Sequence, residues 1–180
     1  MKTIVLFTSN TGFTKQYANW LANDLSCPWI DLSKTKWVDL DEYDMIAFGS
    51  WLMAGKIKKG KQLKSLLKQY QEKNWIVFCV GRTPLDQIDF KSLIHQNFEE
   101  DLPSSVSFFY LPGGFDIDRQ PAFYKWLLTR FKKMLSKKEN KTKEELQIEE
   151  MLSCSIDLSD PKYLSPILMQ IKEEILPVKF

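Results

Sequence analysis

Apolar and polar positions along the chain follow two alternating patterns. Short apolar runs predict strands at residues 3–8, 29–32, 44–50, 75–81 and 106–111, and the first run does not alternate, so we expect that strand to be buried on both faces. Between them, apolar residues recur at intervals of three and four, as around Tyr17, Leu21 and Leu25, which predicts helices. Strands and helices in this order predict an α/β fold, with a parallel sheet between two helical layers.

The pattern changes after the fifth predicted strand. One face of a long predicted helix carries Phe123, Trp126, Leu127, Phe131, Met134 and Leu135. This helix runs into a lysine-rich segment at 136–145, which we interpret as a solvated connection. Asp160 followed by Pro161 predicts the start of a last helix over 161–176. The sequence therefore predicts one domain over 1–180, with an extra helical region near its C-terminal end.

Composition and charge narrow the classes of function. A chain of 180 residues with 44% apolar content can bury a sizeable core. Its 25 basic and 23 acidic residues leave a net charge of +2, so no overall field directs it to nucleic acid. No stretch reads as a signal peptide or membrane span. Three cysteines without metal-ligand spacing are typical of free thiols, so we expect a cytoplasmic location and no metal.

The segment at residues 8–14 places four hydroxyl side chains around Gly12, between the first strand and the first helix. Ligands of open parallel sheets bind beyond the carboxyl ends of the strands. The first N–H groups of a helix have no partner within it, and its dipole adds partial positive charge. Ser9, Thr11 and Thr14 add hydroxyl donors, and Gly12 allows close approach. The segment predicts a phosphate site; the alternative is that its hydroxyls only cap the helix.

Other phosphate chemistries do not match the sequence. The Gly-Lys-Ser/Thr loop of nucleoside triphosphate sites and the G-x-G-x-x-G of dinucleotide sites are both missing. A receiver domain needs carboxylates after strands one and three, where this chain has Thr8 and Gly49. A cysteine phosphatase needs its thiolate in an anion-binding loop, whereas Cys79 lies within the fourth predicted strand. The ligand is therefore a phosphate compound of another kind.

Three segments resemble those of flavodoxins. Ser9-Asn-Thr-Gly-Phe-Thr14 resembles the loop that holds the terminal phosphate of FMN, with Phe13 where electron carriers commonly have asparagine. Tyr43-Asp-Met-Ile-Ala-Phe-Gly-Ser-Trp-Leu-Met-Ala-Gly55 is similar to the segment whose loop lies along the flavin, and Gly81-Arg-Thr83 to a further loop at a strand end. The resemblance implies a flavodoxin-like three-layer sandwich, with a five-stranded parallel sheet in the order 2-1-3-4-5 and helices on both faces.

The resemblance also implies which residues hold FMN. The phosphate would be bound by Ser9, Thr11, Gly12 and Thr14 and by the backbone amides of Asn10, Phe13 and Lys15. The isoalloxazine ring would be lined by Ser50, Trp51 and Leu52, beside the loop of Gly81, Arg82 and Thr83. Trp51 would stack on the ring, and Arg82 would stabilise negative charge on its reduced form. The alternatives are a core tryptophan at the strand end and an arginine that faces solvent.

The C-terminal part resembles a narrower group. Leu111-Pro-Gly-Gly-Phe115, the long helix after it and the segment 155–175 resemble the flavodoxin-domain branch that includes menaquinone-dependent protoporphyrinogen IX dehydrogenase. This implies an FMN-dependent oxidoreductase, acting as a dehydrogenase or quinone-linked reductase. A small electron-transfer flavodoxin is the alternative, although such carriers are acidic around the flavin and this chain is slightly basic. A third hypothesis is a binding module without redox chemistry.

The composition of residues 123–143 allows two interpretations, and one of them is binding to a membrane surface. These residues combine the apolar face with Arg130, Lys132, Lys133, Lys137, Lys138, Lys141 and Lys143. Such a helix can lie on an anionic lipid surface, and it would bring a quinone-linked enzyme to the inner face of the membrane. The sequence favours the simpler interpretation of an amphipathic helix that covers the sheet. It makes no prediction of oligomeric state.

Overall fold

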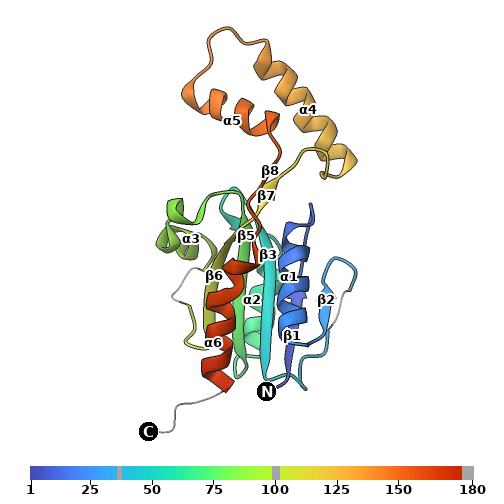
Figure 1. Ribbon diagram of the computed structural model, residues 1–180, viewed down its shortest axis with the longest axis vertical. Coiled ribbons are helices and arrows are strands. Elements are labelled where there is room, and N and C mark those ends of the chain that lie inside the picture. Colours follow the sequence, from blue (N-terminus) through green and yellow to red (C-terminus); the bar gives the residue numbers. More distant parts are fainter. Residues whose placement is uncertain (36–37, 99–101, 176–180) are drawn as a thin grey trace.

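The computed structural model describes residues 1–35, 38–98 and 102–175. Its central sheet contains the parallel strands β1 (Thr3–Phe7), β2 (Trp29–Asp31), β3 (Met45–Met53), β5 (Asn74–Gly81) and β6 (Val106–Pro112). These strands lie in the order β2-β1-β3-β5-β6, and every neighbouring pair is parallel (Figure 1). The α/β class and the order 2-1-3-4-5 predicted from the sequence are confirmed.

Helices cover both faces of this sheet. One face carries α1 (Phe13–Asp24) and α6 (Ser165–Ile175), and the other carries α2 (Gly60–Gln69) and α3 (Phe90–Asn97). The reason lies in the strands, whose successive side chains point to opposite faces. The three-layer arrangement therefore follows from strands that are apolar on both sides.

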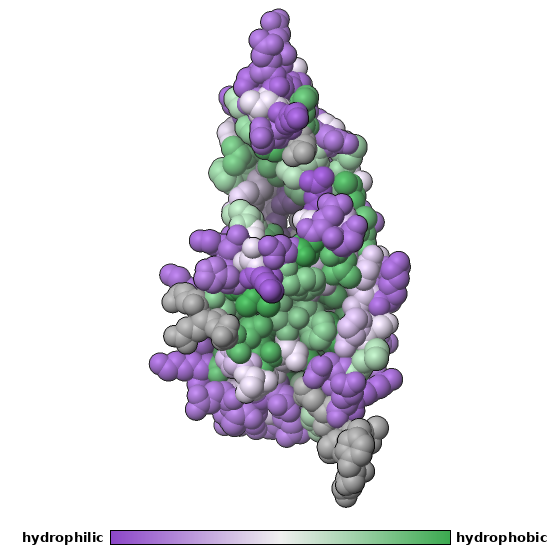
Figure 2. Space-filling view, turned by 90° about the vertical axis from the view of Figure 1, so that its left-hand side faces the viewer, coloured by the Kyte–Doolittle hydropathy of each residue, from purple (hydrophilic) through white to green (hydrophobic). Residues whose placement is uncertain are grey.

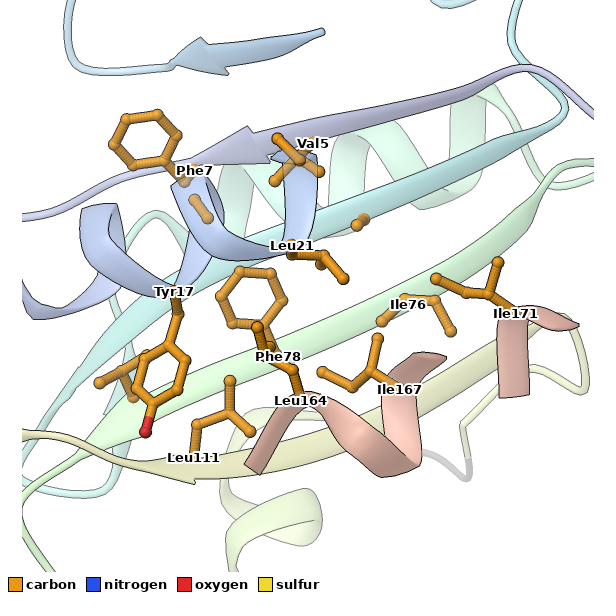
Figure 3. Close-up of a cluster of buried hydrophobic side chains, with 14 of the residues drawn as sticks. Val5, Phe7, Tyr17, Leu21, Ile76, Phe78, Leu111, Leu164, Ile167 and Ile171 are labelled. Atoms are coloured by element: carbon orange, nitrogen blue, oxygen red, sulfur yellow. The ribbon is translucent and has the colours of Figure 1, made fainter. Parts of the chain in front are cut away.

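The strand β1 shows this division clearly. Its residues Val5 and Phe7 belong to the core cluster that includes α1 and α6, while Ile4 and Leu6 belong to the cluster under α2 and α3. Figure 3 shows the first cluster, in which Leu21 of α1 and Ile167 of α6 come from two helices to the same sheet face. Both clusters are buried, and together they form the core.

A short hairpin extends the third strand. Strand β3 continues to Met53, beyond the predicted end at residue 50, and pairs antiparallel with β4 (Lys56–Ile57). The two residues between them, Ala54 and Gly55, both have positive φ, at 49° and 76°. Two-residue hairpin loops prefer this geometry because its twist matches that of the strands. The hairpin projects the chain after β3 over the carboxyl end of the sheet.

After β6 the chain leaves the sheet. Strand β7 (Gly114–Phe115) pairs antiparallel with β8 (Ile156–Asp157), and the residues between them form α4 (Ala122–Ser136) and α5 (Lys143–Ser153). We call residues 116–155 the helical hairpin. Figure 1 shows it beyond the carboxyl ends of the strands and away from the sheet. The prediction that this amphipathic helix covers the sheet is therefore wrong.

The turn away from the sheet is held by the backbone. The N–H group of Gly113 donates to the carbonyl of Gly81 at 2.6 Å, and the N–H group of Leu158 donates to the carbonyl of Gly113 at 2.8 Å. These bonds fix the start and the end of the β7–β8 ribbon against the sheet. The helices α4 and α5 can then pack on each other instead of on the sheet.

Helix α5 was not predicted from the sequence. It begins inside the lysine-rich segment, so the connection runs only from 137 to 142. The Thr142 hydroxyl accepts from the Glu145 N–H at 3.2 Å, and the Glu145 carboxylate accepts from the Thr142 N–H at 3.0 Å. This capping box starts the helix. Lys138 pairs with Glu145 at 2.7 Å, and Lys141 with Glu149 at 2.5 Å.

The last predicted helix begins where Asp160 and Pro161 placed it. The Asp160 carboxylate accepts from the Lys162 N–H at 2.9 Å, which caps a short 3₁₀ turn, η2 (Pro161–Leu164), that leads into α6. Residue 176 of the predicted range lies outside the described residues. In the described part of the chain, no helix has the length and apolar character needed to cross a membrane.

Candidate functional site

A cavity of about 1230 Å³ opens at the carboxyl ends of the strands. Its wall includes Asn10 and Thr11 of the first loop (residues 8–14), the β3–β4 hairpin, the segment from the end of β5 into α3, Tyr110 of β6 and the helical hairpin. Figure 2 shows a hollow between the helical hairpin, at the top, and the sheet below it. The site therefore combines the segments that resemble flavodoxins with the inserted element.

Several hydrogen-bond donors of the first loop and of the start of α1 have no acceptor within the described part of the protein. Gly12 adopts a φ of 98°, and its N–H donates to the Ser9 hydroxyl at 3.1 Å. The N–H groups of Phe13, Thr14 and Lys15, in the first turn of α1, donate to no acceptor among the described residues. Thr14 is only 2% exposed, and its hydroxyl has no partner within the same residues. Unpaired donors at a helix start bind an anion favourably, which fits a phosphate group.

Most of the predicted ring and loop residues lie in the cavity wall. They are Asn10, Thr11, Trp51, Leu52, Gly81, Arg82 and Thr83. The side chain of Phe13 instead packs in the core, with 4% of its surface exposed, so only its backbone N–H is available. This arrangement agrees with the assignment of its amide, and not its ring, to the phosphate.

Ser50 does not reach the cavity. It has no exposed surface, and its hydroxyl donates to the carbonyl of Lys58 at 2.7 Å. This bond ties β3 to the segment that follows β4. The predicted role of Ser50 in lining the ring therefore does not fit this geometry, because the buried hydroxyl already has an acceptor.

Two cationic side chains face the cavity. Arg82 is half-buried in its wall, and its role in stabilising charge on a ligand stays a prediction. Lys58 was not predicted; its ammonium lies 5.2 Å from the centroid of the Trp51 ring. The β3–β4 turn brings it there, and Ala54-Gly55 is the one local sign of that turn in the sequence. Together these charges would stabilise negative charge on a bound ligand.

The loop after β5 is anchored from the neighbouring strand. The Tyr110 hydroxyl donates to the carbonyl of Thr83 at 2.7 Å, and burial raises the pKa of Tyr110 to about 12. A Cβ atom on Gly81 would lie 2.7 Å from this hydroxyl oxygen, so a larger residue there would displace it. Tyr110 thus remains a neutral donor that fixes the position of the Arg82 loop.

The base of the helical hairpin packs directly on the first loop. The Asn10 amide donates to the Gln120 side-chain oxygen at 2.9 Å, and the Arg119 guanidinium lies 5.2 Å from the centroid of the Phe13 ring. A Cβ atom on Gly114 would lie 2.5 Å from the Phe13 ring, so glycine is needed for this close approach. These contacts therefore hold the base of the helical hairpin against the first loop.

The helical hairpin supplies wall residues that sequence reasoning missed. They are Gln120, Tyr124, Leu128, Glu150 and Met151. No local motif marks them, because their placement depends on how the β7–β8 ribbon directs the hairpin. Their side chains extend the cavity beyond the segments that resemble flavin loops.

Comparison with known proteins gives one family match. The family described as "Flavodoxin domain" matches residues 4–143, from β1 to the start of α5. No curated protein matches the chain.

Solved structures give distant matches. A putative flavoprotein from Bacteroides uniformis ATCC 8492 is 16% identical, covers 70% of this chain and 97% of its own, and has a TM-score of 0.47. A flavoprotein in complex with FMN from Lactobacillus acidophilus NCFM is 18% identical, with 61% and 91% covered and a TM-score of 0.44. A flavodoxin from the domain Archaea is 17% identical, with 86% and 100% covered and a TM-score of 0.38.

Proposed function

The chain belongs to the flavodoxin domain family, whose cofactor is FMN, and we propose that it is an FMN-dependent oxidoreductase acting on a small organic molecule. Its reaction would be that of a dehydrogenase or a quinone-linked reductase. The single observation that supports this choice over a free electron carrier is the continuation of the cavity from the flavin loops to the helical hairpin. A wall of this kind suits a molecule seated beside the flavin.

The first loop fits the cofactor phosphate. The unpaired N–H groups of Phe13, Thr14 and Lys15 and the hydroxyls of Thr11 and Thr14 would hold the phosphate at the positive end of α1. The binding energy comes largely from donors that otherwise remain unpaired in a partly buried loop. The phosphate end would thus anchor the cofactor in the cavity.

The remaining flavin contacts come from two loops. Trp51 and Leu52 would pack on the ring and exclude water from it, and Arg82 and Lys58 would hold positive charge near it. When bound, FMN supplies a ring that accepts electrons from an organic substrate and passes them on. The protein's own contribution is to position the ring and to stabilise the charge that develops there.

The substrate side of the cavity is largely apolar. Tyr124, Leu128 and Met151 of the helical hairpin face the same space as Leu52 and Trp51. A flat molecule with apolar surface, such as a quinone, would fit between the ring and this wall. Protoporphyrinogen IX, the substrate of the branch that the C-terminal part resembles, is a second candidate, and its oxidation yields a flat porphyrin. We expect the protein to act from the cytoplasmic side.

An absorbance experiment tests the proposal. Purified protein is mixed with FMN, and the spectrum is recorded; bound flavin should show a shifted visible band. The flavin is then reduced without oxygen and a soluble quinone is added, which should reoxidise it by taking two electrons and two protons to form a quinol. Protein that never binds FMN would contradict the cofactor assignment. Bound FMN that a redox protein reoxidises, but a quinone does not, would indicate an electron carrier.

A further inference from the structure

One face of α4 exposes large apolar side chains away from the rest of the molecule. The exposed fractions are 66% for Phe123, 55% for Trp126, 46% for Leu127, 37% for Phe131 and 61% for Met134. Their spacing of three, four and seven residues places them on one side of the helix. We call these five residues the α4 outer face. Large exposed apolar patches mark surfaces that bind a partner or a membrane.

The α4 outer face is not the surface that holds the helical hairpin together. Leu135 of α4 and Leu152 of α5 are buried, with 2% and 4% exposed, and Leu128 is half-buried. The buried apolar positions of the helical hairpin are thus different residues from those of the outer face. The helical hairpin therefore does not need the α4 outer face for its stability.

Charge identifies the kind of surface that would cover this face. Helix α4 carries no acidic residue, whereas the acidic residues of α5 include Glu145 and Glu149, which pair with Lys138 and Lys141. Arg130, Lys133 and Lys137 have no carboxylate partner among the described residues. An apolar face beside unpaired positive charge complements an anionic lipid surface.

The geometry of the basic residues agrees with this partner. Trp126, Arg130, Lys133 and Lys137 follow one another at intervals of four, three and four, so they form one edge of the outer face. The Arg130 guanidinium lies 5.3 Å from the centroid of the Trp126 ring. Tryptophan with a cationic neighbour suits the boundary between lipid headgroups and acyl chains, where one end of the side chain is apolar and the other is hydrated.

We propose that the α4 outer face docks the protein on an anionic lipid surface. The same hairpin contributes Tyr124 and Leu128 to the cavity wall, so docking would place the cavity close to the bilayer. A substrate dissolved in the membrane could then enter without crossing bulk water. The docking itself does not depend on FMN, and it is tested separately from the redox proposal.

Vesicle sedimentation tests this docking with the full-length protein. We expect binding to vesicles of phosphatidylcholine mixed with phosphatidylglycerol, weaker binding to phosphatidylcholine alone, and a decrease with added salt. The triple variant Arg130→Ala, Lys133→Ala, Lys137→Ala should bind the anionic vesicles on the order of 100-fold more weakly, since each basic residue contributes about fivefold. The double variant Phe123→Ser, Trp126→Ser should lose binding to both vesicle types.

A matched control variant separates docking through α4 from a nonspecific effect of the protein's positive charge. The triple variant Lys61→Ala, Lys68→Ala, Lys172→Ala removes the same charge from exposed positions on α2 and α6 and should bind like the wild type. Circular dichroism confirms that each variant folds. Equal binding of both triple variants, or no vesicle binding by the wild type, would overturn the proposal. Self-association that disappears in Phe123→Ser, Trp126→Ser, without vesicle binding, would assign the face to a second copy and overturn it too.

Discussion

The Asn10 side-chain amide donates a 2.9 Å hydrogen bond to Oε1 of Gln120, across 110 residues of sequence. It joins the loop expected to hold the FMN phosphate to the base of the helical hairpin. Both residues also line the cavity, so the bond joins the predicted phosphate loop to the wall that the helical hairpin supplies.

A double-mutant cycle measures what this hydrogen bond contributes to the free energy of unfolding. Asn10→Ala and Gln120→Ala should each destabilise the protein, and the double variant should be less destabilised than the sum, by about 0.5–1.5 kcal/mol. Urea unfolding supplies the values. Strict additivity of the two changes would mean that the bond contributes nothing.

The phosphate assignment makes a prediction about two threonines. Thr11→Ala and Thr14→Ala each remove a hydroxyl that would bond to a charged group, a contribution of roughly 1.5–3 kcal/mol. We expect FMN affinity to fall by about tenfold or more in each variant, measured by fluorescence titration. Thr129→Ala on α4 is the control, since its hydroxyl bonds only to the carbonyl of Lys125. Unchanged affinity in both loop variants would place the phosphate elsewhere.

Gly114 is predicted to be essential for seating the ribbon. A Cβ atom there would lie 2.2 Å from the carbonyl oxygen of Ile156 and 2.5 Å from the Phe13 ring. Gly114→Ala should destabilise the protein by about 1–3 kcal/mol, because a backbone oxygen cannot move without displacing the ribbon. Gly60→Ala is the matched control, since its nearest neighbour would be Ile57 Cβ at 3.9 Å. Equal unfolding midpoints in urea for the two variants would contradict the packing argument.

The role of the helical hairpin can be tested by removing it. Phe115 and Ile156 pair directly, so an Asn-Gly turn can replace residues 116–155 and close the β7–β8 ribbon. We expect FMN binding to be retained, because the three flavin loops remain. The KM for a quinone should rise about tenfold or more, since the apolar wall is lost. Steady-state kinetics give the answer, and an unchanged KM would show that the hairpin does not contact the substrate.

The half-buried Cys27 thiol and the buried Tyr110 phenol predict how stability depends on pH. Burial raises the pKa of Cys27 from 9.0 to about 11, and it raises the pKa of Tyr110 from 10.0 to about 12. Above the ordinary values the unfolded chain loses these protons while the folded protein keeps them, so stability should fall as pH rises. For Cys27 the fall spans pH 9.0 to about 11. Urea unfolding should show a shallower decline for Cys27→Ala, and stability that stays constant over this range would contradict the prediction.

The parts of this protein that the sequence predicted are those fixed by local chemistry. Apolar runs located the five parallel strands, and the runs are longest where β1, β3 and β5 are buried on both faces, because such strands need consecutive apolar residues. The hydroxyl-rich segment around Gly12 located the candidate phosphate loop, because its donors lie within one turn of chain. Asp160 and Pro161 located the last helix for the same reason, through a cap formed by neighbouring residues.

Tertiary structure decided what the apolar face of α4 contacts. Helical periodicity shows that Phe123 and Trp126 share a face, but it cannot show whether a sheet, a partner or solvent lies opposite. That depends on Gly114, whose missing side chain lets the ribbon sit against Phe13 and direct the helices away from the sheet. The burial of Ser50 and the placement of Lys58 likewise depend on the β3–β4 hairpin. The sequence alone therefore determined the sheet and its first loop, while contacts between distant residues determined the wall and outer surface of the site.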